Sequence, residues 1–145
     1  MIQGFFDPHS TRPVPKVRVS LFLPGISTDD AHVDFLLDTG ASTTCLHPRD
    51  ARAVGISAAR LLLPDRWPRQ RSAAGIGGSS LYYLVPAHYA FEHDNGQWEI
   101  HEGEILVAQL QPANERLPSL LGWNILQRFR ITAEWASRQI TLENV

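Results

Sequence analysis

The chain has 145 residues, a formal net charge of −2 at pH 7 and 43% hydrophobic residues, which is the composition of an ordinary globular domain. These values exclude a disordered or fibrous chain, and the near-neutral charge argues against nucleic acid as a partner. The single cysteine, Cys45, excludes an intrachain disulfide. We therefore expect a fold that is stabilised by packing alone, in a reducing cytoplasm.

The first residues do not have the pattern of a targeting or membrane segment. Asp7, His9 and three prolines up to Pro15 stand where a signal peptide has a cationic start and an apolar stretch. No apolar run reaches the roughly 18 residues that span a bilayer. We expect no membrane partner, and a single domain over residues 1–145 in which residues 1–15 form an irregular N-terminal arm.

Two apolar segments near the start are predicted to be strands. Between Val17 and Leu23 apolar and polar residues alternate, and Pro24-Gly25 closes the segment with a turn. Residues 32–37 continue in the same style and run directly into Asp38. The acid is therefore predicted to lie where a strand passes into a loop.

The middle of the chain contains a helix signal and a hairpin signal. Residues 48–54 suit one or two helical turns, with proline at the first position and Gly55 as the stop. A polar, basic stretch ends at Arg71, and a glycine cluster and a β-prone run over 81–91 follow it. Asp94-Asn95-Gly96-Gln97 then predicts a hairpin with a type I′ turn, since Asn-Gly supplies two residues with positive φ.

The last third supplies the second helix and the closing strands. Residues 123–129 place Ile125, Leu126 and Phe129 on one helical face, and strands are predicted over 130–134 and 139–142. Many short strands with two short helices predict an all-β fold, mainly an antiparallel closed β-barrel.

The chemistry of the chain centres on Asp38. A buried acid at the end of an apolar strand is costly, and proteins keep one where it is paired, hydrogen-bonded or functional. Thr39 can supply a hydroxyl to the loop, Gly40 permits a close backbone approach, and the small Ala41 leaves room for a ligand. A loop with an Asx turn would produce the same tripeptide for structural reasons alone.

Three segments in order resemble the retropepsin-like aspartic proteases. Residues 35–42 (Phe-Leu-Leu-Asp-Thr-Gly-Ala-Ser) are similar to the active-site segment of that family. Residues 75–78 (Gly-Ile-Gly-Gly) are similar to the tip of its flap, a hairpin that folds over bound peptide. Residues 120–122 (Leu-Leu-Gly), before a helix, are similar to the segment that threads beside the active-site loop. The resemblance implies the retropepsin-like acid protease fold.

The resemblance also implies a role for each matching residue. The residues with expected catalytic roles are Asp38, Thr39 and Gly40. The residues expected to bind substrate are Ala41, Ser42, Gly75, Ile76, Gly77 and Gly78. The residues expected to support the active-site loop are Leu120, Leu121 and Gly122.

Two positions depart from the retroviral pattern. Retroviral chains usually have an acid where this chain has Ser42 and an arginine where it has Trp123, before the matching Asn124. Because both halves of that ion pair are missing together, no unpaired charge is left. A non-viral member of the family is therefore expected, in which Trp123 covers the same spot by packing.

Other readings of the motifs are weaker. The glycine cluster is followed by a β-prone segment without lysine, which does not fit a phosphate-binding loop. The six histidines lack paired metal-ligand spacing, so no metal or cofactor is expected. Cys45 lies in an apolar strand and is expected to be a small buried hydrophobe, not a nucleophile.

One Asp-Thr-Gly in the chain cannot by itself supply both the acid and the base that peptide hydrolysis needs. We therefore expect a homodimer in which Asp38 and its twin share one proton and activate water against an extended peptide or protein substrate. Strands near the termini are expected to help join the subunits; the β-prone tail, residues 139–142, is one candidate, and the sequence does not decide which termini interleave. The alternatives are a catalytically silent module for dimerisation or peptide binding, and a plain β-barrel ligand binder.

Overall fold

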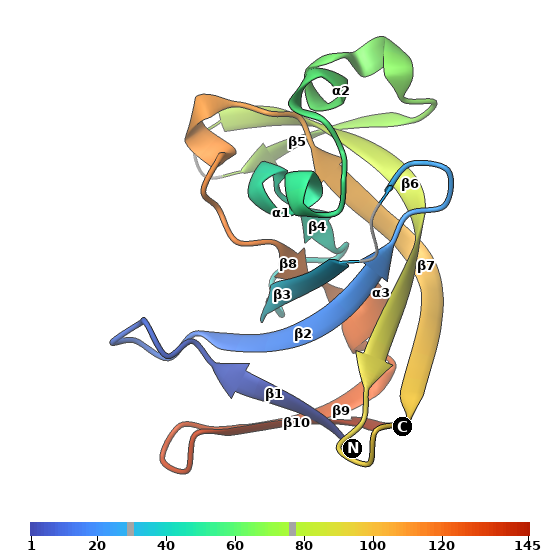
Figure 1. The fold of residues 1–145 in the computed structure, drawn as a ribbon. Coiled ribbons are helices and arrows are strands. Elements are labelled where there is room, and N and C mark those ends of the chain that lie inside the picture. The colour runs from blue at the N-terminus through green and yellow to red at the C-terminus, as the bar shows by residue number, and fades with distance from the viewer. Residues whose placement is uncertain (29–30, 76–77) are drawn as a thin grey trace.

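The computed structural model describes residues 1–28, 31–75 and 78–145, which form ten strands and three short α-helices (Figure 1). The strands are β1 (Ile2–Phe6), β2 (Pro15–Phe22), β3 (Ala31–Leu37), β4 (Cys45–Leu46), β5 (Gln70–Gly75), β6 (Gly78–Glu92), β7 (Trp98–Ala108), β8 (Leu120–Leu121), β9 (Phe129–Glu134) and β10 (Gln139–Asn144). The helices are α1 (Pro48–Ala53), α2 (Ala58–Leu62) and α3 (Trp123–Leu126), with single 3₁₀ turns at Pro64–Arg66 and Pro112–Asn114. The mostly-β class predicted from the sequence is confirmed.

The strands form one sheet in the order β5-β6-β7-β4-β8-β3-β2-β1-β10-β9. An additional pairing between β6 and β2 closes the six strands from β6 to β2 into a ring. Most pairings are antiparallel, and the parallel ones are β3 with β8 and β4 with β7. The strand pairings thus show a closed ring of strands, and the closed β-barrel stays a prediction.

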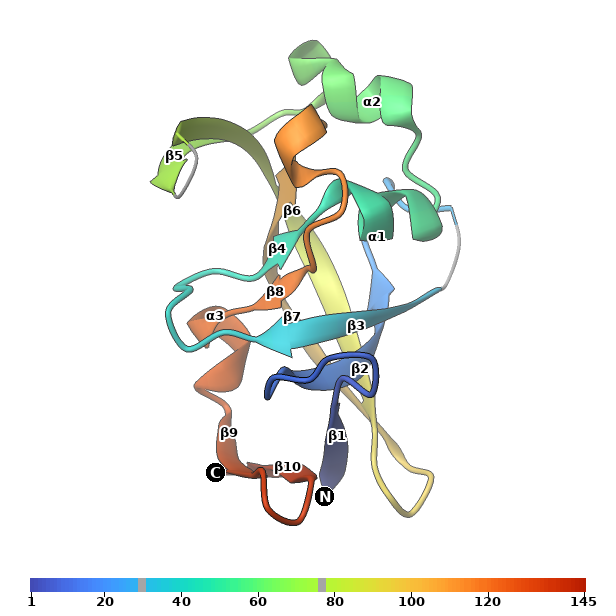
Figure 2. The same ribbon diagram turned by 90° about the vertical axis from the view of Figure 1, so that its left-hand side faces the viewer.

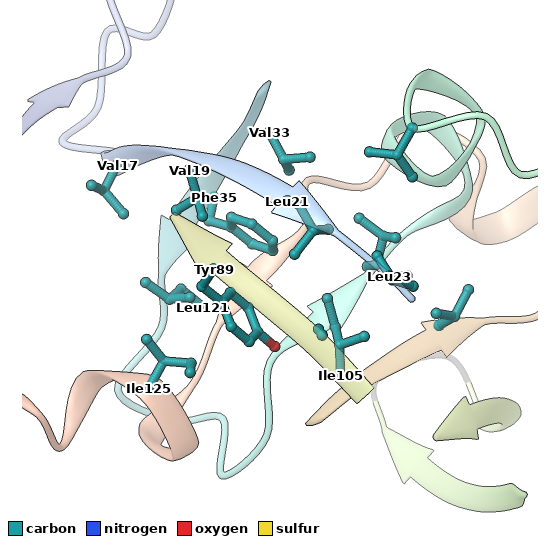
Figure 3. Close-up of a cluster of buried hydrophobic side chains, with 14 of the residues drawn as sticks. Val17, Val19, Leu21, Leu23, Val33, Phe35, Tyr89, Ile105, Leu121 and Ile125 are labelled. Atoms are coloured by element: carbon teal, nitrogen blue, oxygen red, sulfur yellow. The ribbon is translucent and has the colours of Figure 1, made fainter. Parts of the chain in front are cut away.

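Much of the core comes from strands of this ring and follows from the alternation of apolar residues in β2 and β3. Val17, Val19 and Leu21 of β2 are fully buried, as is Phe35 of β3, because alternate side chains of a strand point to one face. Figure 3 shows the ring of Phe35 beside that of Tyr89 from β6, with 6.5 Å between the ring centroids. Burial of each such side chain contributes about 1.5–3 kcal/mol to stability. The same cluster includes Leu23, Val33, Ile105, Leu121 and Ile125.

The helices differ from the prediction in number and in length. α1 begins at Pro48 as expected, and it ends before Gly55, whose φ is +90°. α3 stops at Leu126 because the chain enters β9 at Phe129. The expectation of two helices was wrong, since it missed α2. None of the helices in the described ranges is long and apolar enough to cross a membrane.

The missed helix α2 has one buried apolar residue and a single polar cap. Leu61 is its buried residue, and the hydroxyl of Ser57 accepts a hydrogen bond from the backbone N–H of Arg60 at 3.2 Å. This is the N-cap contact that starts a helix. A helix of five residues is too short to produce a recognisable apolar period, which explains why the sequence pattern did not reveal it.

The expectation that residues 1–15 form an irregular arm was wrong for the first part of that segment. β1 lies between β10 and β2, with Ile2 opposite Leu142 and Phe5 opposite Lys16. Ile2 is only 1% exposed. The prolines, which suggested irregular structure, all follow β1, and the irregular part is residues 7–14. Apolar contacts and sheet pairing therefore decide the conformation of the first six residues.

The hairpin predicted at residues 94–97 is present, but its turn is of another type. β6 and β7 pair up to Glu92 opposite Trp98. The N–H of Gly96 donates to the carbonyl of His93 at 2.9 Å. The N–H of His93 in turn donates to the carbonyl of Gln97 at 2.7 Å. Gly96 has a φ of +84°, whereas Asn95 does not have a positive φ. This is a three-residue loop in which a glycine follows a tight turn, not a two-residue type I′ turn.

Candidate active site

Asp38 directly follows β3, at the point where this strand is held between β2 and β8. The N–H of Asp38 donates to the carbonyl of Leu121 at 3.1 Å, and the N–H of Leu36 donates to that of Ser119 at 2.9 Å. The strand is therefore held up to its last residue. Asp38 is half-buried, whereas Thr39 and Gly40 are exposed. The predicted position of the acid at a strand-to-loop junction is the position that it has.

The loop is closed by Asp38 itself. Its Oδ1 accepts a hydrogen bond from the N–H of Gly40 at 2.8 Å, and its carbonyl accepts one from Ala41 at 3.2 Å. The contact between Oδ1 and the N–H of Gly40 is an Asx turn, which a purely structural role of Asp38 would also require. Among the described residues, however, Oδ2 of Asp38 has no hydrogen-bond partner. The turn therefore orients the carboxylate and leaves one oxygen available for chemistry.

Residues 120–122 lie beside this loop, and their role as its support stays a prediction that the resemblance implies. Leu120 and Leu121 form β8 and pair with the end of β3 in parallel. A Cβ atom on Gly122 would lie 2.7 Å from the backbone carbon of Thr43 and 2.8 Å from the carbonyl oxygen of Ala41. Only a glycine permits this approach, because both neighbours are backbone atoms that cannot rotate away.

A buried hydrogen-bond network fixes the far end of the loop to α3. Thr44 is fully buried, and its N–H and hydroxyl both donate to Oδ1 of Asn124, at 2.9 and 2.8 Å. The Thr44 hydroxyl also accepts from the N–H of Gly122 at 3.0 Å. The amide nitrogen of Asn124 donates to the carbonyl of Glu104 in β7 at 2.8 Å. Loop, helix and sheet are thus joined by polar contacts whose partners are satisfied.

Trp123 and Ser42 occupy the positions that differ from the retroviral pattern. The indole N–H of Trp123 donates to the carbonyl of Thr39 at 2.7 Å, and the N–H of Asn124 donates to the carbonyl of Ser42 at 3.0 Å. Trp123 nevertheless remains 43% exposed. It therefore holds the active-site loop by a hydrogen bond, and not only by the packing that we expected.

A cavity of about 550 Å³ lies between this loop and the β5–β6 hairpin. Figure 2 shows β5 and the loop between β3 and β4 on the same side of the molecule. The lining residues from the loop are Asp38, Gly40, Ala41, Ser42 and Thr43. The remaining lining residues are Cys45, His47, Arg71, Ala73, Tyr82, Leu106 and Leu120.

The predicted flap coincides with the β5–β6 hairpin. Gly75 pairs with Gly78 at the end of the two strands. The predicted tip residues Ile76 and Gly77 lie outside the described residues. The hairpin therefore stands where a cover for the cavity is needed, and the flap role itself stays a prediction.

Several lining residues were missed by the sequence reasoning, although a signal for two of them existed. Once the hairpin is centred on residues 76–77, antiparallel pairing places Arg71 opposite Tyr82, as observed. Cys45, by contrast, reaches the cavity through its pairings with Leu106 and Leu120 on two different strands. Those pairings join segments far apart in the chain, and no local pattern announces them.

Cys45 and His47 are neutral members of the cavity wall. Burial raises the pKa of the Cys45 thiol to about 12, so the residue is not a nucleophile at neutral pH. Nδ1 of His47 lies 2.6 Å from the carbonyl oxygen of Pro118, which places the ring proton there. Burial also lowers the pKa of His47. Within the described ranges, no three or more His, Cys, Asp or Glu side chains gather as they would to hold a metal ion.

Comparison with known proteins agrees with this geometry. A family model described as aspartyl protease matches residues 25–125, which include β3, the Asp38 loop, the β5–β6 hairpin and residues 120–122. No curated protein matches the chain.

Proposed function

The chain belongs to a retropepsin-like aspartyl protease family, and we propose that it is an aspartic endopeptidase in which Asp38 activates water for peptide hydrolysis. The observation that supports this proposal most strongly is the orientation and position of the Asp38 carboxylate. One oxygen is fixed by the N–H of Gly40, and the side chain lines a cavity of about 550 Å³. An oriented acid beside a space of that size suits general acid–base chemistry on a bound peptide.

The proposed working form is a homodimer, because each chain contributes a single Asp-Thr-Gly. A two-fold axis would bring the same loop of two chains together without any further sequence. Thr39 and Gly40 are exposed at the loop, and Trp123 beside them is 43% exposed, which leaves this surface open to a second copy. Among the described residues the hydroxyl of Thr39 has no hydrogen-bond partner. We therefore assign it a bond across the axis.

The mechanism that we propose uses the two Asp38 side chains as one unit. Two carboxylates in contact cannot both ionise readily, so the pair holds one proton. The ionised member takes a proton from water as the water attacks the scissile carbonyl carbon. The protonated member donates a hydrogen bond to the carbonyl oxygen, and a proton then passes to the leaving amine. The proposed reaction uses no covalent intermediate.

The terminal strands limit how the two copies can meet. The tail was one candidate for pairing with the partner, but β10 lies between β1 and β9 of its own chain, so both of its edges are occupied. β9 is the edge of the sheet at this end, and its residues 132–134 are exposed. We therefore assign any strand contact with a partner to β9 and not to residues 139–142.

The direct test is cleavage of a peptide library by the purified protein and by Asp38→Asn. Asparagine keeps the shape of the side chain but cannot exchange the proton, so we expect a loss of about a hundredfold or more in kcat/KM. Circular dichroism should show an unchanged fold. Asp65→Asn, which changes an exposed acid outside the cavity, is the matched control. Cleavage by Asp38→Asn within about tenfold of the wild type would refute the assignment.

A further inference from the structure

The hairpin presents one cation to the cavity in front of Asp38. Arg71 and Ala73 line the cavity, and the residues on either side of Arg71 do not, which is the alternation of a strand with one face turned inward. Tyr82 lines it too and is the cross-strand partner of Arg71. Cross-strand partners share a face of the sheet, so guanidinium and phenol belong to one wall.

Arg71 is not engaged by the protein itself. Over the described part of the chain its guanidinium has no carboxylate within 4.0 Å and makes no side-chain hydrogen bond, whereas its backbone pairs with Tyr82 in the sheet. Arg69, two residues earlier in the chain, is engaged by an ion pair with Glu104 at 2.5 Å. Among the described residues that line the cavity, Arg71 is the only lysine or arginine, and burial lowers the pKa of His47, which disfavours its cationic form. Arg71 is therefore the cation that the cavity offers to a ligand.

The floor of the same cavity is apolar. Leu106, Leu120 and Cys45 line it, and the pairings of β4 with β7 and β8 hold these three residues side by side. The thiol of Cys45 remains protonated, since its pKa is about 12. The aliphatic part of a substrate side chain would pack on this floor, because its transfer from water to an apolar surface is favourable. A carboxylate at the end of that side chain would then reach the wall that carries Arg71.

We propose that this cavity is a specificity pocket for an acidic substrate side chain, glutamate above all, and that Arg71 recognises its carboxylate. Guanidinium and carboxylate form paired, charge-assisted hydrogen bonds, which glutamine and leucine cannot reproduce. The Tyr82 hydroxyl on the same wall is a further donor. This inference rests on the proposed protease function and adds a substrate class to it.

The test compares peptides that differ at one position, with glutamate, glutamine, leucine or lysine, in a sequence that the wild type cleaves. At the position that occupies the pocket, we expect kcat/KM to be roughly five- to tenfold higher for glutamate than for glutamine. Arg71→Gln should remove this preference, and Arg71→Lys should retain most of it. Arg71→Glu should invert it in favour of lysine.

Arg66→Gln is the matched control, because it removes an exposed arginine that does not line the cavity. Its preference should equal that of the wild type. Three results would overturn the role of Arg71. They are no preference for glutamate at any position, a preference that survives Arg71→Gln, and a loss of kcat/KM in Arg71→Gln that is equal for all peptides. If a folded wild type cleaves no peptide at all, the proposed function fails instead, so the two failures are distinguishable.

Discussion

The indole nitrogen of Trp123 lies 2.7 Å from the carbonyl oxygen of Thr39 and donates a hydrogen bond to it, although 84 residues separate the two in the chain. The contact joins the first residue of α3 to the loop that carries Asp38. Because the indole is 43% exposed, its main effect is on the position of the loop and not on burial. We infer that this contact stands in for the arginine that the retroviral pattern has at this position.

Trp123→Phe is expected to lower activity more than stability. Phenylalanine keeps most of the aromatic surface but has no N–H for the Thr39 carbonyl, and such a bond is worth about 1 kcal/mol. We therefore expect kcat/KM to fall by about three- to tenfold, measured on one peptide at several concentrations. Trp98→Phe, at another exposed tryptophan, should change neither quantity. Equal activity of Trp123→Phe and the wild type would show that the hydrogen bond does not position the loop.

Gly122→Ala is expected to destabilise the protein and disturb the site together. The new Cβ would lie 2.7 Å from the backbone of Thr43, so the loop or β8 has to shift. Overpacking of this kind costs about 3 kcal/mol when the neighbours cannot rotate away. Urea unfolding measures the loss. Gly103→Ala is the control, because its Cβ would meet its nearest neighbour at 3.4 Å, an ordinary contact, and its effect should stay within about 0.5 kcal/mol.

Thr44→Val tests the buried network behind the loop. Valine has nearly the shape of threonine but leaves the N–H of Gly122 without its acceptor and removes one bond to Asn124. We expect a loss of about 2 kcal/mol in the free energy of unfolding, since an unsatisfied buried donor is costly. Thr132→Val, at an exposed position of β9, should leave the unfolding midpoint almost unchanged. A loss no larger than that of this control would mean that the network does not stabilise the fold.

The sequence was informative wherever a local pattern decides the structure. The alternation in residues 17–23, the proline at position 48 and the apolar approach to Asp38 are local, and each led to the observed element. The adjacency of Asp38 and Gly122 was predicted only through the family resemblance. The contacts of Cys45 and the ring closure by β6 and β2 depend on pairings between distant segments. Local sequence propensity also mispredicted β1, which was expected to be irregular. There the burial of Ile2 and the pairing with β10 outweigh that propensity.

His47 makes stability depend on pH. Burial lowers its pKa in the folded protein, although the carbonyl of Pro118 and the charge of Asp50 oppose this shift. The unfolded chain then binds a proton more readily than the folded one, so stability is complete above about pH 6.5 and falls as the pH drops below that value. The free energy of unfolding, measured at pH 7 and pH 5, should decrease less in His47→Gln than in the wild type. The exposed His9, changed to glutamine, should leave the difference unaltered; an identical decrease in all three proteins would contradict the role of His47.

The central claim is that one Asp38 from each of two chains forms the catalytic pair. Mixing wild type with Asp38→Asn in varied ratio, at fixed total concentration and after subunit exchange, tests it most directly. If only dimers with two aspartates are active, activity follows the square of the wild-type fraction, so an equal mixture retains about one quarter of the activity. Activity that falls in direct proportion to the wild-type fraction, with half left in the equal mixture, would contradict the shared pair.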